Sequence, residues 1–117
     1  MLILIAGPYR SGTNDDARLM RENLGRLEAM ALPLFRMGHI PMIGEWVALP
    51  LLQLAGSRRP GDEAYEEVLY PVAHRLLSKC DAVFRMEGAS KGADEDVRIA
   101  KERGLPVYYR LEDVPVS

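Results

Sequence analysis

The chain has 117 residues, 48% of them apolar and 27% charged, which predicts one globular domain over residues 1–117 and excludes a disordered tail or a collagen-like chain. Fifteen Lys and Arg residues against seventeen Asp and Glu give a formal net charge of −2, so no basic field favours nucleic acid or an anionic membrane as a partner. Cys80 is the only cysteine and cannot form a bridge within the chain, so the predicted compartment is the cytoplasm.

The predicted elements begin with an apolar run at residues 2–6, which is too short for a signal segment or a membrane span and is expected to be a buried strand. A first helix is expected after residues 13–16, whose hydroxyl, amide and acidic side chains suit a helix N-terminus. It runs to Gly38, and Pro33 is expected to kink or shorten it. The second strand covers residues 39–43.

A second helix is predicted at residues 45–54, before an exposed loop at residues 57–61. Asp62 is expected to cap a third helix that runs to Lys79 and is interrupted by Pro71.

The remaining elements are a strand at residues 81–86, a helix at residues 93–103 and a strand at residues 106–109. Each predicted strand is an unbroken apolar run of the kind that is covered on both faces. The fold class is therefore α/β, a flavodoxin-like three-layer sandwich with a parallel sheet of about four strands. Ligands of such sheets bind beyond the carboxyl ends of the strands, so the loops after the first and third strands are expected to carry the chemistry.

The first of these loops has the glycine spacing of a phosphate-binding P-loop, but Thr13 stands where the P-loop lysine would be. An NTPase is therefore disfavoured. The loop can still hold one phosphate through its amides, its hydroxyl group and the charge of its arginine. A tight turn with a solvated arginine is the alternative. The candidate binding residues here are Gly7, Arg10, Ser11 and Gly12.

The second loop leads into three consecutive acids, Asp94, Glu95 and Asp96. Acids suit a helix N-terminus, so capping alone is one interpretation. Asp96 shares a helix face with Ala100 at the i, i+4 spacing, which favours Asp96 as the acid that points into the cleft. Asp94 and Glu95 are expected nearer the rim.

Four motifs, at residues 5–10, 38–41, 80–83 and 90–93, have an order and spacing that resemble the nucleoside 2-deoxyribosyltransferase superfamily, in particular its short bacterial branch. The related 2′-deoxynucleoside 5′-phosphate N-hydrolases share the two loops. The resemblance covers about residues 1 to 109 and is loose between residues 44 and 72. It implies cleavage of the N-glycosidic bond of a nucleoside or nucleotide by a carboxylate that acts at C1′.

The resemblance also implies roles for individual residues. The family places its catalytic glutamate four residues before an alanine, and counting back from Ala100 reaches Asp96, which is one methylene shorter; Glu95 is the alternative if the turn is offset by one residue. Tyr9 stands where the transferases have a tyrosine that orients the nucleophile. The residues at positions where the nucleotide hydrolases contact phosphate are Arg10, Ser90 and Gly92.

The sequence departs from the family eight residues before Asp81, where Ala73 replaces an aspartate. The adjacent His74 has a suitable pKa for proton transfer but points about 100° away on a helix, so a structural role is favoured. Glu45 and Trp46 follow the second strand and are candidates for a wall against a nucleobase. A core or interface role for Trp46 is the alternative.

The two histidines and one cysteine lack the spacing of a metal site, so no metal and no cofactor are predicted. The expected partner is a small-molecule nucleoside or nucleotide, and the apolar residues Leu49, Leu51, Leu52 and Leu54 predict a homodimer or a higher homo-oligomer. Two functions remain open: an N-glycosidase or deoxyribosyltransferase, and a non-catalytic nucleotide-binding protein that kept the phosphate loops.

Overall fold

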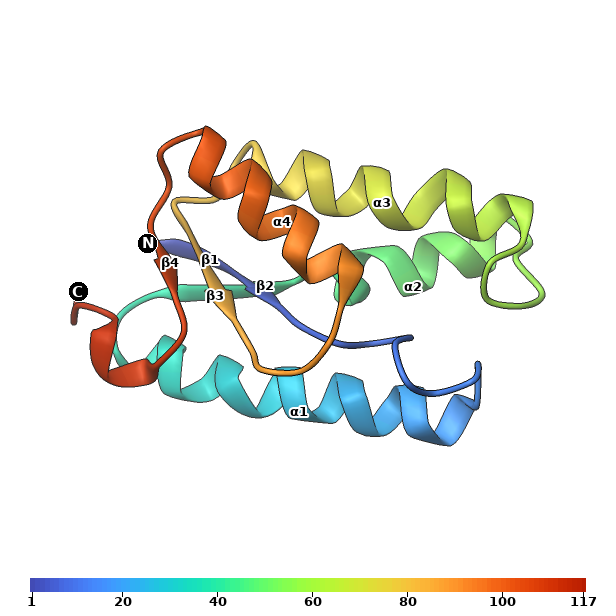
Figure 1. Cartoon of the computed structure of the whole chain (residues 1–117), viewed down its shortest axis with the longest axis horizontal. Helices are drawn as coiled ribbons and strands as arrows, with labels where there is room; N and C mark the ends of the chain where they lie inside the picture. The colour runs from blue at the N-terminus through green and yellow to red at the C-terminus, as the bar shows by residue number, and fades with distance from the viewer.

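The computed structural model describes residues 1–117 as an α/β sandwich built on one parallel sheet (Figure 1). The four strands lie in the order β2-β1-β3-β4, and every neighbouring pair is parallel. Their bounds are Leu2–Ala6 for β1, Ile40–Ile43 for β2, Ala82–Arg85 for β3 and Val107–Tyr108 for β4. The helices are α1, Ala17–Arg36; α2, Gly44–Leu54; α3, Glu63–Leu77; α4, Lys91–Glu102; and the 3-10 turn η1, Leu111–Asp113.

The central strand β1 divides the core into two layers because its side chains alternate between the faces of the sheet. Ile3 and Ile5 pack with residues of α1 on one face. Leu4 and Ala6 pack with residues of α3 and α4 on the other. The fold is therefore a three-layer sandwich, with α1 on one side of the strands and α3 and α4 on the opposite side (Figure 1).

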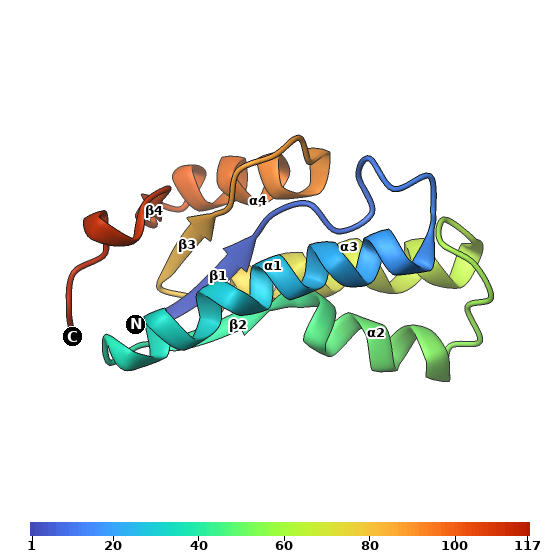
Figure 2. The ribbon, with the colours of Figure 1, turned by 90° about the horizontal axis from the view of Figure 1, so that it is seen from below.

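The chain order reverses across β1, and this reversal positions the functional site. The chain passes from β1 through α1 to β2 on one side, and then crosses through α2 and α3 to β3 on the other side of β1. In a parallel sheet such a reversal opens a crevice beyond the carboxyl ends of the strands. Figure 2 shows α2 leaving the end of β2 and running beside α3, away from the sheet.

The helix starts follow from local capping. The Asp16 carboxylate accepts hydrogen bonds from the amides of Arg18 and Leu19, and Asp62 accepts one from the amide of Tyr65, so this predicted cap is confirmed. The last helix begins at Lys91, two residues earlier than expected, because the Ser90 hydroxyl accepts a bond from the Ala93 amide and acts as the N-cap.

Neither proline ends its helix, so the expected interruption at Pro71 was wrong. Helix α1 continues through Pro33, and α3 continues through Pro71. A proline inside a helix leaves the carbonyl four residues earlier without its usual partner. Those carbonyls belong to the exposed residues Ala29 and Glu67, where water can hydrogen-bond to them, so neither helix ends there. None of the helices has the length and apolar character needed to cross a bilayer.

Replacing Gly7 with alanine should lower the free energy of unfolding. A Cβ atom at this position would lie 2.7 Å from Cδ2 of Leu27 and 2.9 Å from Cβ of Met86, so the loop after β1 would have to shift. Overpacking of this kind costs about 1–3 kcal/mol. Urea unfolding measures the change. Gly25→Ala is the matched control: it lies in α1 with no atom within 4 Å of the added methyl, and it should stabilise the helix by about 0.8–1.0 kcal/mol. Equal effects of the two substitutions would contradict the assigned packing.

Candidate active site

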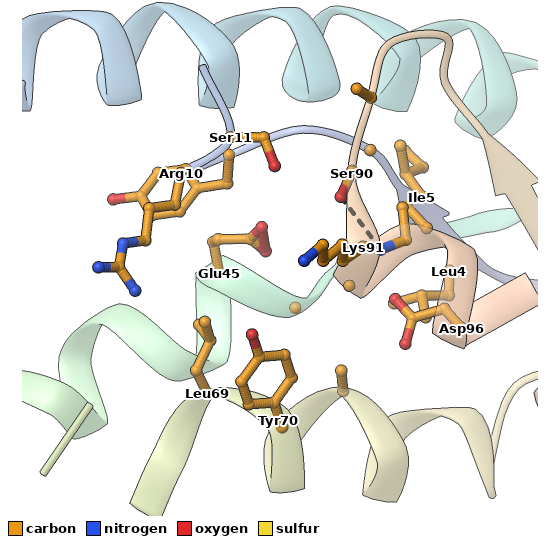
Figure 3. A pocket seen from close by; sticks show the side chains of 18 of the residues that line it. Leu4, Ile5, Arg10, Ser11, Glu45, Leu69, Tyr70, Ser90, Lys91 and Asp96 are labelled. Atoms are coloured by element: carbon orange, nitrogen blue, oxygen red, sulfur yellow. Dashed lines mark hydrogen bonds between the residues drawn. The ribbon is translucent and has the colours of Figure 1, made fainter. Parts of the chain in front are cut away.

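A cavity of about 500 Å³ lies beyond the carboxyl ends of β1 and β3, between the loops predicted to carry the chemistry (Figure 3). This volume falls within the range of sites that hold a small organic ligand. Its walls come from the β1–α1 loop, the first residues of α2, the inner face of α3 and the N-terminal half of α4. The lining residues are Leu4, Ile5, Ala6, Gly7, Tyr9, Arg10, Ser11, Gly12, Asp15, Gly44, Glu45, Tyr65, Leu69, Tyr70, Ala73, Ala89, Ser90, Lys91, Gly92, Ala93 and Asp96.

Asp96 projects from α4 at one end of the cavity, and only 9% of its surface is exposed. Burial removes its carboxylate from water, and the nearby charges of Glu45 and Glu95 add repulsion. Together these effects raise the pKa of Asp96 to about 7, although the charge of Arg85 opposes the shift. Asp96 is therefore an uncompensated carboxyl group that faces the interior of the cavity.

Glu45 brings a second carboxyl group into the cavity from the first turn of α2, on the opposite side from Asp96 (Figure 3). Burial raises its pKa to about 7, and its own backbone amide opposes this shift. The pKa of Tyr9, which also lines the cavity, is raised by burial and by the charge of Glu45. Such perturbed groups within one cleft are typical of functional sites.

Two predicted site residues, Glu95 and Trp46, do not line the cavity. The carboxylate of Glu95 accepts bonds of 2.6 and 3.0 Å from the guanidinium of Arg98, which lowers its pKa. The Trp46 indole donates a 2.8 Å bond to Glu28 of α1. Successive helix residues point about 100° apart. Glu95 and Trp46 are therefore turned away from the cavity that their neighbours Asp96 and Glu45 line.

The β1–α1 loop contributes all four residues that its glycine pattern indicated, Gly7, Arg10, Ser11 and Gly12. Arg10 is already engaged by the chain itself. Its Nε lies 2.6 Å from Oδ1 of Asp15, and its guanidinium lies 5.4 Å from the centre of the Tyr65 ring. A Cβ atom at Gly61 would lie 2.7 Å from the Arg10 guanidinium. Glycine at this position therefore leaves room for Arg10 in its present conformation.

The first turn of α4 forms the wall beside Asp96. Ser90 and Gly92 both line the cavity, as predicted, and the Ser90 hydroxyl accepts a 3.1 Å bond from the Ala93 amide. The side chain of Lys91 extends into the space between Glu45 and Asp96 in Figure 3. Lys91 was not among the predicted residues, although its position between Ser90 and Gly92 indicated that it belonged to the same turn.

Arg85 at the end of β3 holds the loop that leads to this turn. Its guanidinium donates hydrogen bonds to the carbonyls of Met86 and Gly88 and lies 2.9 Å from Oδ1 of Asp94. The Asp94 side chain is 72% exposed and does not line the cavity. Through these contacts Arg85, at the end of β3, is joined both to the loop and to the first turn of α4.

The α3 wall shows what sequence reasoning missed. Ala73 lines the cavity, and His74 does not line it. Three further lining residues of α3, Tyr65, Leu69 and Tyr70, were not predicted. They fall in the region where the resemblance is loose, so no motif marked them. Only their spacing on one helix face carried a signal.

No group of three or more His, Cys, Asp and Glu side chains is arranged to hold a metal ion. Comparison of the chain with protein-family models, curated proteins and solved structures finds no match.

Proposed function

We propose that the protein cleaves or transfers the N-glycosidic bond of a nucleoside or a nucleoside 5′-monophosphate, with Asp96 acting at C1′ of the sugar. The observation that carries this proposal is the buried carboxyl group of Asp96, which no ion pair neutralises, in a cavity large enough for a nucleoside. The resemblance of the four sequence motifs to the deoxyribosyltransferases points to the same residue.

The chemistry follows from the roles of the lining groups. The Asp96 carboxylate forms a bond to C1′ while the C1′–N bond breaks, and the base leaves with the bonding electron pair and takes up a proton. Water or a second base then releases the sugar from Asp96. Tyr9 lines the same cavity and, with its raised pKa, keeps its hydroxyl proton; the resemblance gives a tyrosine at this position the role of orienting the nucleophile.

The second candidate is a nucleotide-binding protein without catalytic activity. Ala73 favours this alternative, because the cavity lacks a side-chain carboxyl group at the place where the related family carries an aspartate. Asp96 is also one methylene shorter than the family's glutamate, and a displacement of about 1 Å can reduce a rate about a hundredfold. Both candidates therefore bind a nucleoside or nucleotide, but only the enzyme releases the free base.

The test is to incubate the protein with ribonucleosides, 2′-deoxynucleosides and their 5′-monophosphates and to measure free base by chromatography. Release from at least one class, absent without protein, supports the enzyme. Ligand binding by calorimetry with no release from any member supports the binding protein. If the protein neither binds nor cleaves any member of the panel, both candidates are wrong.

Arg10→Ala should weaken the binding of a 5′-monophosphate by about tenfold to a hundredfold, the value of a charge-assisted hydrogen bond, and should change nucleoside binding little. Asp15 already occupies part of the guanidinium, so a phosphate has to compete with it. Asp15→Asn should accordingly strengthen monophosphate binding. Calorimetry with a nucleoside and its monophosphate measures both effects. If Arg10→Ala keeps the parent's ratio of monophosphate to nucleoside affinity, the phosphate binds elsewhere.

A further inference from the structure

Tyr65 has the only buried side-chain polar atom of the chain that lacks a hydrogen-bond partner. The residue is 3% exposed, lies in the first turn of α3 and lines the cavity. A buried hydroxyl without a partner is unfavourable, because it has lost its bonds to water and gained none in return. Because Tyr65 borders a ligand-sized cavity, a ligand bound there can supply the missing partner.

The groups around Tyr65 define what that ligand can offer. The Arg10 guanidinium lies over the face of the ring, but its charge is paired with Asp15. Burial raises the pKa of Tyr65, Arg10 opposes the rise, and Tyr9 and Glu45 add to it. The hydroxyl therefore keeps its proton and is able to donate it to an acceptor on a ligand.

Glu45 supplies an acceptor to this wall of the cavity. The Glu45 carboxylate has no ion-pair partner and, when ionised, only accepts hydrogen bonds. Tyr70 adds another phenol, and its hydroxyl points into the cavity in Figure 3. A ligand that complements this wall carries an N–H₂ group for the carboxylate, next to an acceptor for the Tyr65 hydroxyl.

We infer that the Tyr65 hydroxyl and the Glu45 carboxylate together bind the edge of an amino-substituted nucleobase, of the cytosine or adenine kind, in preference to its oxo analogue. The exocyclic amine donates to Glu45, and the adjacent ring nitrogen accepts from Tyr65. An oxo base places a carbonyl oxygen where the amine would be, and that oxygen faces the carboxylate. The inference rests on the proposed function only in taking the ligand to be a nucleoside.

The test compares two pairs of ligands that differ only at this position: 2′-deoxycytidine with 2′-deoxyuridine, and 2′-deoxyadenosine with 2′-deoxyinosine. Dissociation constants are measured by calorimetry on the full chain carrying Asp96→Asn, so that the ligand stays intact. We expect the amino member of at least one pair to bind about tenfold more tightly, the difference that one hydrogen bond makes.

Two further substitutions, added to the same chain, assign the preference to residues. Tyr65→Phe keeps the ring beneath Arg10 and removes only the hydroxyl; it should weaken binding of the preferred amino ligand about threefold to tenfold. It should not lower the thermal unfolding midpoint, because the removed hydroxyl has no partner in the protein. Glu45→Gln replaces an acceptor with an amide that also donates, and it should shift the preference toward the oxo member.

Tyr109→Phe is the matched control, since it removes a hydroxyl from an exposed tyrosine outside the cavity and should leave all four constants unchanged. Equal affinities within both pairs, with base release intact in the parent protein, would overturn the inference and leave the proposed function standing. A loss of unfolding temperature in Tyr65→Phe without loss of affinity would assign the hydroxyl a structural role and overturn the inference too. If none of the four nucleosides binds, both the base preference and the assignment of a nucleoside as the ligand are wrong.

Discussion

Asp96→Asn should reduce base release by about a thousandfold or more while nucleoside binding persists. The amide has nearly the shape of the carboxylate but cannot form the bond to C1′, and the loss of a nucleophile costs several powers of ten in rate. The side chain is 9% exposed and makes no ion pair, so the substitution leaves no charged partner unpaired. Base release is followed by chromatography, and binding by calorimetry.

Glu95→Gln is the matched control for this experiment, because it neutralises the neighbouring acid, which is paired with Arg98 outside the cavity. The control should release base at close to the parent rate. If Asp96→Asn retains the parent rate and Glu95→Gln loses it, the nucleophile is Glu95 and the turn is offset in solution from the arrangement described above. If both retain it, the reaction uses neither acid.

The centre of the sheet could be predicted from the sequence because β1 is an unbroken apolar run that is followed by Gly7. Ile3, Leu4 and Ile5 are each at most 2% exposed, and such a run is typical of a strand covered on both faces. The effect of Pro33 and Pro71 could not be predicted in the same way. Whether a helix continues through a proline depends on the solvation of one carbonyl, which is a property of the assembled fold.

The candidate site could be predicted where the chemistry lies in a contiguous motif. The loops after β1 and β3 supply Arg10, Ser90 and Asp96 to one cavity, and the i, i+4 relation to Ala100 selected Asp96 over its neighbour. Tyr65 was missed because only the packing of α3 against α2 brings it into the cavity. Its spacing with Leu69 and Tyr70 places it on one face of the helix, but tertiary packing decides what that face contacts.

The free energy of unfolding should fall as the pH rises from about 4.5 to 7.5. The ordinary pKa values of Asp96 and Glu45 are 3.8 and 4.5, and burial raises both to about 7 in the folded protein. Between these values the folded protein binds more protons than the unfolded chain, so raising the pH favours unfolding. Each carboxyl taken alone accounts for a loss of about 3–4 kcal/mol, and the loss is complete above about pH 8.

Asp62 acts in the opposite direction at lower pH. Backbone amides of Arg58 and Tyr65 donate to its carboxylate and lower its pKa to about 2. Its stabilising effect is present above its ordinary pKa of 3.8 and is lost as the pH falls toward 2. The free energy of unfolding should therefore have its maximum near pH 4, between the loss caused by protonation of Asp62 and the decline caused by the two cavity carboxyls. Urea unfolding between pH 3 and pH 8.5 measures the profile.

The double variant Asp96→Asn with Glu45→Gln should be more stable than the parent at pH 8 and should lose the decline between pH 4.5 and 7.5. Glu102→Gln, at an exposed carboxyl outside the cavity, is the control and should keep the decline. A parent protein that is equally stable at pH 5 and pH 8 would show that neither cavity carboxyl has a raised pKa. Buried charges that cost stability are retained where function requires them. A variant that loses base release while gaining stability at pH 8 would therefore separate the catalytic role of Asp96 from any role in folding.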